Sequence, residues 1–357
     1  MKTAIIGLPM VGKTSLFTIL TGVHESTRVG TMEARVGVTK VPDARLEALA
    51  KIFDPPKITY ATVDYLDFPA VSKEALRDPS YLASMRVADA LAHVLRLFQS
   101  DTVPHEKGSV DPIRDLEDVD TELILSDLVV VEKRLERLEK DRKKAKSPEL
   151  DREIALIERC KQTLESDTAL RSLEFTPEEE KTIRGFQFLS LKPMLFVLNI
   201  GEEDAARMQE IEDQYRTGAL AGRPNTAVTA ICGKIEAELA ELSPAEQKEY
   251  LSSYGLKDSG LERLIAATYA LLGLMSFLTA GETEVRAWTI PMNSTAPKAA
   301  GAIHSDFEKK FIRAEVVNWQ ALVDYKGYPG VREKGLLRLE GKEYIVKDGD
   351  VLVIRHG

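Results

Sequence analysis

The sequence has few cysteines and no long apolar run. Cys160 and Cys232 are the only two cysteines among 357 residues, and their wide separation leaves no metal-spaced cluster. No apolar run reaches the length that crosses a membrane, and a short apolar strand, rather than a signal peptide, is predicted at the N-terminus. We therefore expect a protein of the reducing cytoplasm that uses no membrane and no cysteine-ligated metal.

An excess of positive charge is also missing. Lysine and arginine total 48 against 57 aspartate and glutamate residues, so the formal net charge is -9. This balance argues against a surface that coats nucleic acid throughout, and it leaves room for a local basic patch. The chain is too long for one ordinary core and its 44% apolar content is typical of globular proteins, so we expect two or three domains.

The first motif is a strand, a glycine-containing loop and a helix. Residues 4–6 predict a buried strand, and residues 7–14 fit the pattern G-x-x-x-x-G-K-T of a phosphate-binding P-loop. The glycines let backbone N–H groups face inward, and the following helix presents its positive end to the same phosphates. The predicted phosphate-binding residues are Gly7, Pro9, Met10, Val11, Gly12, Lys13, Thr14 and Ser15.

Three side chains are predicted to serve Mg²⁺. Thr14 offers a hydroxyl directly after Lys13, which brings its charge to the β- and γ-phosphates. Thr31 lies in a polar loop, where a threonine completes the Mg²⁺ shell when a γ-phosphate is present, as in the first switch of P-loop GTPases. Residues 58–64 are predicted to form a strand ending in Asp64, from which a second acidic group reaches Mg²⁺ through water.

The predicted base-binding segment follows a buried strand at residues 194–199. The chain carries Asn199-Ile200-Gly201-Glu202 where a GTPase carries Asn-Lys-x-Asp, whose aspartate accepts two N–H donors from guanine. The longer Glu202 side chain cannot occupy the same position, and Ile200 lacks the lysine stem that packs over the base. Adenine presents an amino donor on this edge and lacks the N2 donor, so the substitution favours ATP over GTP. The remaining predicted base contacts are Cys232, Gly233 and Lys234.

Between these segments the sequence predicts a helical hairpin. Apolar residues recur at close to heptad spacing over residues 123–138, and a second apolar stripe covers residues 154–164. Both stripes are flanked by charges, which indicates an antiparallel, coiled-coil-like insertion. Cys160 fits the second stripe, so its predicted role is packing.

The C-terminal part changes character near Gly281. Short strands are predicted at residues 285–290, 311–317, 344–346 and 351–354, with a helix at 297–303. This pattern indicates a small β-grasp module with no catalytic constellation. We expect it to act as a binding surface.

Together these motifs resemble the YchF group of Obg-like P-loop ATPases along nearly the whole chain. The resemblance rests on residues 7–13, 41–46, 111–115, 121–125, 132–138, 199–202, 234–239, 277–289 and 304–309. It implies an α/β P-loop NTPase fold of the Ras-like type with an inserted coiled-coil hairpin and a C-terminal TGS domain. The expected bounds are 1–114 and 189–279 for the nucleotide-binding domain, 115–188 for the hairpin and 280–357 for the TGS domain.

The resemblance also implies a preference for ATP, Mg²⁺ bound through Thr14 and Thr31, and association with the ribosome, ribosomal RNA or translation factors. Members of the family lack the glutamine that orients water in Ras-like enzymes, and a histidine before the hairpin is assigned that task. His105 matches its place, so His105 and Lys13 are the predicted catalytic residues. We expect a monomer.

Two departures from the family pattern bear on hydrolysis. The family's glycine-rich second switch is missing here, since residues 64–69 contain no glycine and the next glycine is Gly108. Asp67 in this segment brings a like charge toward the γ-phosphate, a repulsion that matters at ~4 Å even in a partly solvated site. Met10 stands where the family usually has an asparagine that helps bind an activating monovalent cation.

Three functions therefore stay open. The first is an ATP-binding, slowly hydrolysing switch protein that acts on a translation complex. The second is a nucleotide-gated binding module that barely hydrolyses, because its second switch is altered. The third is a GTPase, which competition between ATP and GTP for the site distinguishes from the other two.

Overall fold

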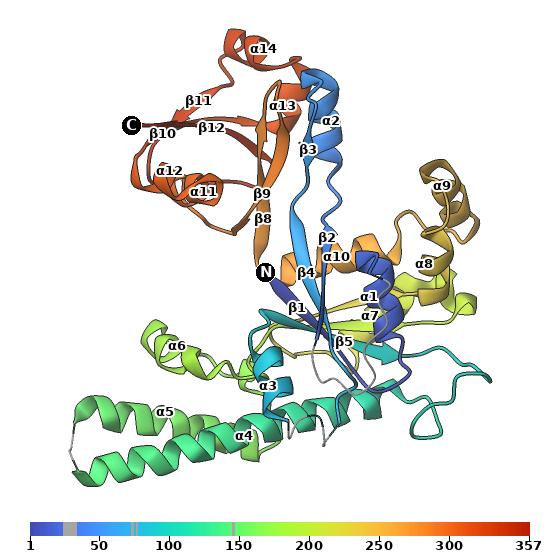
Figure 1. Cartoon of the computed structure of the whole chain (residues 1–357), viewed down its shortest axis with the longest axis vertical. Coiled ribbons are helices and arrows are strands. Elements are labelled where there is room, and N and C mark those ends of the chain that lie inside the picture. The colour runs from blue at the N-terminus through green and yellow to red at the C-terminus, as the bar shows by residue number, and fades with distance from the viewer. Residues whose placement is uncertain (24–33, 73–74, 76–77, 145–146) are drawn as a thin grey trace. The chain divides into compact units, whose positions relative to one another are not determined.

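The computed structural model describes residues 1–357 except 24–33, 73–74, 76–77 and 145–146 (Figure 1). The chain forms two compact units, each made of two separate stretches of sequence. The first unit comprises Met1–Gly37 and Asp64–Leu271, and the second comprises Val38–Val63 and Leu272–Gly357.

The first unit is built on a six-stranded sheet in the order β2-β4-β1-β5-β6-β7. The strands β1, β4, β5, β6 and β7 pair in parallel. Every residue of β5 and β6 is buried, as expected of parallel strands whose faces are both covered by helices. The strand bounds are β1 Lys2–Ile6, β2 Arg35–Lys40, β4 Thr62–Asp67, β5 Ala90–Arg96, β6 Met194–Asn199 and β7 Thr226–Ile231.

Helices cover this sheet and connect its strands. Helix α1 follows the P-loop, and α7 and α10 pack against β7. Helix α9 was not predicted from sequence, although the capping box of Ser243 and Glu246 marks its start. The helix bounds are α1 Lys13–Thr21, α3 Pro79–Arg86, α7 Met208–Thr217, α8 Gly233–Leu239, α9 Pro244–Ser253 and α10 Gly260–Leu271.

The predicted hairpin is present within the first unit as α4 (Pro112–Lys144) and α5 (Pro148–Glu165), followed by α6 (Pro177–Ile183). The Ser147 side chain accepts a hydrogen bond from the Leu150 N–H and caps α5, whose first residue is proline. Cys160 is fully buried in the apolar seam between the helices, and burial raises the pKa of its thiol to about 11. Its predicted packing role agrees with this position.

The second unit is a mixed six-stranded sheet in the order β11-β10-β12-β8-β9-β3, with α11 packed on β9 and β10. This is the expected sheet-and-helix arrangement of a β-grasp module. The strands are β3 Ile58–Thr59, β8 Leu274–Ala280, β9 Val285–Pro291, β10 Phe311–Asn318, β11 Arg338–Glu340 and β12 Asp350–His356. The helices are α2 Ala44–Phe53, α11 Ala296–Ile303, α12 Ser305–Lys309, α13 Trp319–Asp324 and α14 Tyr328–Glu333.

The division into units differs from the expected boundaries in two respects. Residues 38–63 belong with the C-terminal unit, because α2 packs on α13 and β3 pairs with β9. Strand β8 belongs to the C-terminal sheet as well, which moves that boundary before residue 274. The strand predicted at 344–346 is wrong, since Ile345 makes only an isolated bridge to Thr295.

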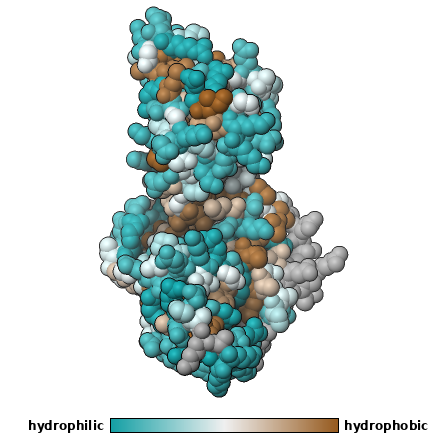
Figure 2. All heavy atoms as spheres, turned by 90° about the vertical axis from the view of Figure 1, so that its left-hand side faces the viewer, coloured by the Kyte–Doolittle hydropathy of each residue, from teal (hydrophilic) through white to brown (hydrophobic). Residues whose placement is uncertain are grey.

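Apolar side chains are concentrated inside the units rather than on long surface stretches. The face drawn in Figure 2 is mostly hydrophilic, with apolar residues in small patches. Among the helices that the structure describes, none combines the length and the apolar character needed to span a membrane.

Candidate nucleotide site

The P-loop connects β1 to α1 with a backbone that requires glycine at two positions. Gly7 has φ +145°, and a Cβ there would lie 2.7 Å from the carbonyl oxygen of Val94. Gly12 has φ +100°, and a Cβ there would lie 2.5 Å from Nδ2 of Asn199. Both positions therefore exclude a side chain for conformational and for steric reasons. Met10 adopts a left-handed conformation with φ +59° and is exposed.

Lys13 is buried at the first position of α1. Its ammonium group donates a hydrogen bond of 2.6 Å to the carbonyl oxygen of Leu8, which belongs to the same loop. Burial lowers the pKa of Lys13 to about 8, against the opposing influence of the Asp67 and Glu106 charges. A triphosphate would stabilise the charged form, because it brings several negative charges to this ammonium group.

The hydroxyl of Thr14 faces a buried carboxylate. Its Oγ1 donates a 3.3 Å hydrogen bond to Oδ2 of Asp67, and Arg35 forms an ion pair with the same oxygen. The other carboxylate oxygen, Oδ1, is buried and has no hydrogen-bond donor among the described residues. A hydroxyl beside a carboxylate with a spare oxygen suits Mg²⁺ and its bound water, so these residues fit the predicted metal. When bound there, Mg²⁺ would neutralise phosphate charge.

The predicted role of Asp64 requires a correction. Strand β4 does not end at Asp64 but continues to Asp67, and Asp64 pairs with Lys2 at the start of β1. Asp67 pairs with Ile5, near the end of β1 where the P-loop begins. The structure thus brings Asp67, rather than Asp64, to Thr14. Thr31 lies outside the described residues.

A cavity of about 500 Å³ adjoins the P-loop and corresponds to the predicted base site. Asn199 forms its inner wall: its Nδ2 donates to the carbonyl oxygen of Val11 at 3.0 Å, and its Oδ1 accepts from the Gly233 N–H at 3.1 Å. The amide therefore connects the P-loop to the first residue of α8. The cavity is lined by Gly12, Ser15, Leu16, Phe98, Gln99, Ser100, Asn199, Ile200, Gly201, Glu202, Glu203, Ile231, Cys232, Gly233, Lys234 and Ala237.

Two of the predicted base contacts are buried and a third is exposed to solvent. Ile200 and Cys232 are almost fully buried, with exposed fractions of 2% and 1%. Burial raises the pKa of the Cys232 thiol, so this residue contributes shape rather than charge. Lys234 is exposed and forms an ion pair with Glu202, which places its charge at the mouth of the cavity.

The carboxylate of Glu202 is held from two sides. Lys234 binds Oε2, and the hydroxyl of Tyr254 donates a 2.6 Å hydrogen bond to Oε1. These two hydrogen bonds lower the pKa of the Glu202 carboxyl, so it stays ionised and can accept further N–H donors. Tyr254 could not be predicted from the sequence, because it lies 52 residues from Glu202 in a segment without a motif.

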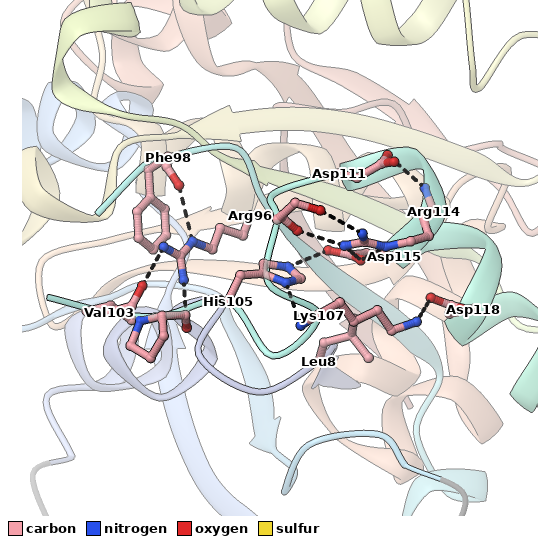
Figure 3. A network of polar contacts seen from close by, with 12 residues as sticks. Leu8, Arg96, Phe98, Val103, His105, Lys107, Asp111, Arg114, Asp115 and Asp118 are labelled. Carbon is pink, nitrogen blue, oxygen red and sulfur yellow. Dashed lines mark hydrogen bonds and ion pairs between the residues drawn. The ribbon is translucent and has the colours of Figure 1, made fainter. Parts of the chain in front are cut away.

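His105 lies in the loop between β5 and α4, and Figure 3 shows its ring directed at Asp115. Nε2 lies 2.8 Å from Oδ2 of Asp115, and Nδ1 accepts a hydrogen bond from the Lys107 N–H. The tautomer that satisfies both contacts carries its proton on Nε2, which leaves neither nitrogen available to a water molecule. Arg114 binds the other oxygen of Asp115 and fixes this carboxylate further.

The same loop is anchored at its start by Arg96, which is buried at the end of β5 (Figure 3). Its guanidinium donates to the carbonyl oxygens of Phe98, Val103 and Pro104. The loop is therefore held at both ends, and catalysis by His105 would require its ring to leave Asp115.

The arrangement as a whole provides a loop of backbone amides, a buried ammonium, a hydroxyl with a carboxylate, and an adjoining cavity with an acidic rim. It is suited to bind a nucleoside triphosphate with Mg²⁺. The family model YchF-GTPase_C, described as a protein of unknown function (DUF933), matches residues 274–357. The chain is 40% identical to the ribosome-binding ATPase YchF of Bacillus subtilis, with 99% of both chains covered.

The protein of the same description from Escherichia coli O157:H7 is 41% identical, with 98% of both chains covered. The solved structure of the Schizosaccharomyces pombe YchF GTPase matches with a TM-score of 0.85 and 30% identity, covering 99% of this chain and 97% of that one. This chain belongs to the YchF family.

Proposed function

We propose that this chain is a Mg²⁺-dependent ATPase that binds ribosomes or translation complexes as a cytoplasmic monomer. The observation that carries the proposal is the P-loop of residues 7–14 joined by Asn199 to a cavity rimmed by Glu202. The bacterial relatives are named ribosome-binding ATPases, which supports both the reaction and the partner.

Within this proposal each side chain has a stated task. Lys13 neutralises the β- and γ-phosphates, Thr14 and Asp67 hold Mg²⁺ directly and through water, and Glu202 accepts the amino group of adenine. His105 orients the attacking water once its ring leaves Asp115. Thr31 retains its predicted place in the Mg²⁺ shell.

The choice of base is tested by competition. The Schizosaccharomyces pombe relative is named a GTPase, so ATP and GTP are both candidates. We expect unlabelled ATP to displace a fluorescent ATP analogue at lower concentration than GTP, because ionised Glu202 attracts an amino donor and repels the O6 acceptor of guanine. Tighter binding of GTP would contradict the assignment.

A nucleotide-gated module with little hydrolysis is the alternative, and the hydrogen bonds that occupy both ring nitrogens of His105 make it worth testing. Single-turnover hydrolysis of ATP with and without ribosomes distinguishes the two. A rate at the level of ATP in buffer under both conditions would exclude the ATPase. Lys13→Ala should abolish nucleotide binding, whereas Lys161→Ala on the hairpin should leave it unchanged.

A further inference from the structure

Arg35 places a permanent positive charge at the proposed Mg²⁺ seat. It is the first residue of β2, and its guanidinium forms an ion pair with Oδ2 of Asp67, the oxygen that also accepts from Thr14. Both side chains are largely buried, with 14% of Arg35 and 4% of Asp67 exposed. The guanidinium carbon lies 4.9 Å from the centre of the Phe17 ring on α1, which holds it over a buried apolar surface.

The charge of Arg35 opposes the electrostatic repulsion that Asp67 exerts on a bound phosphate. A carboxylate next to a phosphate-binding loop repels the incoming anion, and the repulsion is stronger in a partly buried site than in water. Arginine keeps its charge at all relevant pH values, and its guanidinium is less strongly hydrated than an ammonium group. The positive charge of Arg35 therefore balances the negative charge of Asp67 before any metal binds.

We propose that Arg35 is an internal counter-cation that partly replaces Mg²⁺ in nucleotide binding. This inference rests on the proposed function, since it concerns the same phosphate site. Arg35 offsets the repulsion between Asp67 and the phosphates in the absence of metal. With Mg²⁺ bound the metal supplies that charge, so the contribution of Arg35 is smaller. Arg35 thus reduces the dependence of nucleotide affinity on Mg²⁺.

The test measures the dissociation constant of a fluorescent ATP analogue from the full chain, once in excess EDTA and once in saturating Mg²⁺. The informative quantity is the constant in EDTA divided by the constant in Mg²⁺. In Arg35→Gln this ratio should rise on the order of tenfold over the wild type, because a buried hydrogen-bonded charge is lost. Arg35→Lys should stay near the wild-type ratio because it keeps the charge. Arg134→Gln, which breaks a remote ion pair on the hairpin, should not change the ratio.

The double variant Arg35→Gln, Asp67→Asn separates charge from local packing. With the carboxylate also neutral the repulsion disappears, so the ratio should return toward that of the wild type. An unchanged or lower ratio in Arg35→Gln would overturn the inference. A ratio in the double variant that stays as high as in Arg35→Gln would overturn it as well. If the wild-type chain bound no ATP under either condition, the proposed function itself would fail.

Discussion

Among single side chains, Lys13 carries the clearest dependence on pH. Burial lowers its pKa to about 8 in the free protein, whereas phosphate binding requires the charged ammonium. Below about pH 8 the charge is present, so Lys13 causes no pH dependence there. Above about pH 8 Lys13 of the free protein loses its proton and must take one up when ATP binds. The affinity for ATP should therefore fall by up to about tenfold per pH unit.

Titrations of ATP binding from about pH 7 to about pH 10 measure this effect, with proton uptake followed by calorimetry in two buffers. Lys13→Arg is the matched variant. Its guanidinium keeps the charge, so weaker but pH-independent binding is expected. Binding at alkaline pH without proton uptake by the wild type would contradict the assignment.

Tyr254 is expected to contribute to the choice of base. Its hydroxyl holds Oε1 of Glu202 at 2.6 Å, while its ring contacts that of Tyr250 edge-on at a centroid distance of 5.3 Å. Tyr254→Phe removes the hydroxyl and keeps the ring, so Glu202 is held by Lys234 alone. The preference for ATP over GTP should fall about fivefold, the effect of one hydrogen bond.

Competition of both nucleotides against a fluorescent analogue gives the preference directly. Tyr325→Phe is the control, because Tyr325 is an exposed residue of the unit that does not hold the P-loop. Equal weakening of ATP and GTP in Tyr254→Phe would indicate a purely structural role.

The residues of the phosphate site could be predicted because their chemistry follows from local spacing. The glycines, Lys13 and Thr14 lie within one short motif, and the structure places them around one loop. The end of β4 could not be fixed in the same way, because Asp64 and Asp67 both follow apolar residues and only pairing with β1 distinguishes them. Arg35 and Tyr254 carry no motif, since their importance arises from contacts made by folding.

Among the secondary-structure elements, α4 is attached to the nucleotide-binding fold through Asp127. This carboxylate is fully buried, forms a 2.8 Å ion pair with Arg86 and accepts hydrogen bonds from the N–H groups of Leu189 and Ser190. Asp127→Ala leaves a buried charge and two amides without their partner. The free energy of unfolding should fall by about 3–5 kcal/mol, as in other broken buried pairs.

Urea denaturation measures this loss, and hydrogen exchange at residues 189–190 locates it. Glu153→Ala is the comparison, because it breaks the partly exposed pair with Arg134 on the same hairpin. Such a pair is worth about 0–1 kcal/mol, so the two variants should differ clearly. Similar stabilities would show that Asp127 is not a principal attachment of α4.

Long periodic elements were the ones that sequence could predict. The hairpin helices repeat their apolar residues over many turns, and β6 is a continuous apolar run whose predicted bounds are confirmed. Residues 344–346 have a comparable apolar pattern, but they pair only through one isolated bridge. Short segments are decided by their neighbours in the fold, which periodicity cannot supply.

The molecule as a whole has a discontinuous C-terminal unit, which could not be predicted from sequence because residues 38–63 follow the P-loop region. Figure 1 shows α2 beside strands that come more than two hundred residues later. Leu46 and Leu49 of α2 are fully buried in one core with Val285 and Val317. Arg45 adds a 2.6 Å ion pair with Asp348.

We therefore expect residues 272–357 alone not to form a stable domain, although the family model begins at residue 274. Removing α2 exposes the apolar surface that Leu46 and Leu49 cover, and removing β3 leaves the edge of β9 unpaired. A fragment of residues 272–357 should show no cooperative thermal transition and poor dispersion of its amide resonances. Addition of residues 38–63 through a flexible linker should restore both properties.

The single variant Leu46→Ala tests the same core in the intact chain. It should lower the stability of the C-terminal unit by about 2–5 kcal/mol, as expected for a fully buried leucine. Nucleotide affinity should stay unchanged, because Leu46 lies outside the unit that holds the P-loop. A fragment of residues 272–357 that unfolds cooperatively by itself would show instead that α2 is an accessory to a core already complete.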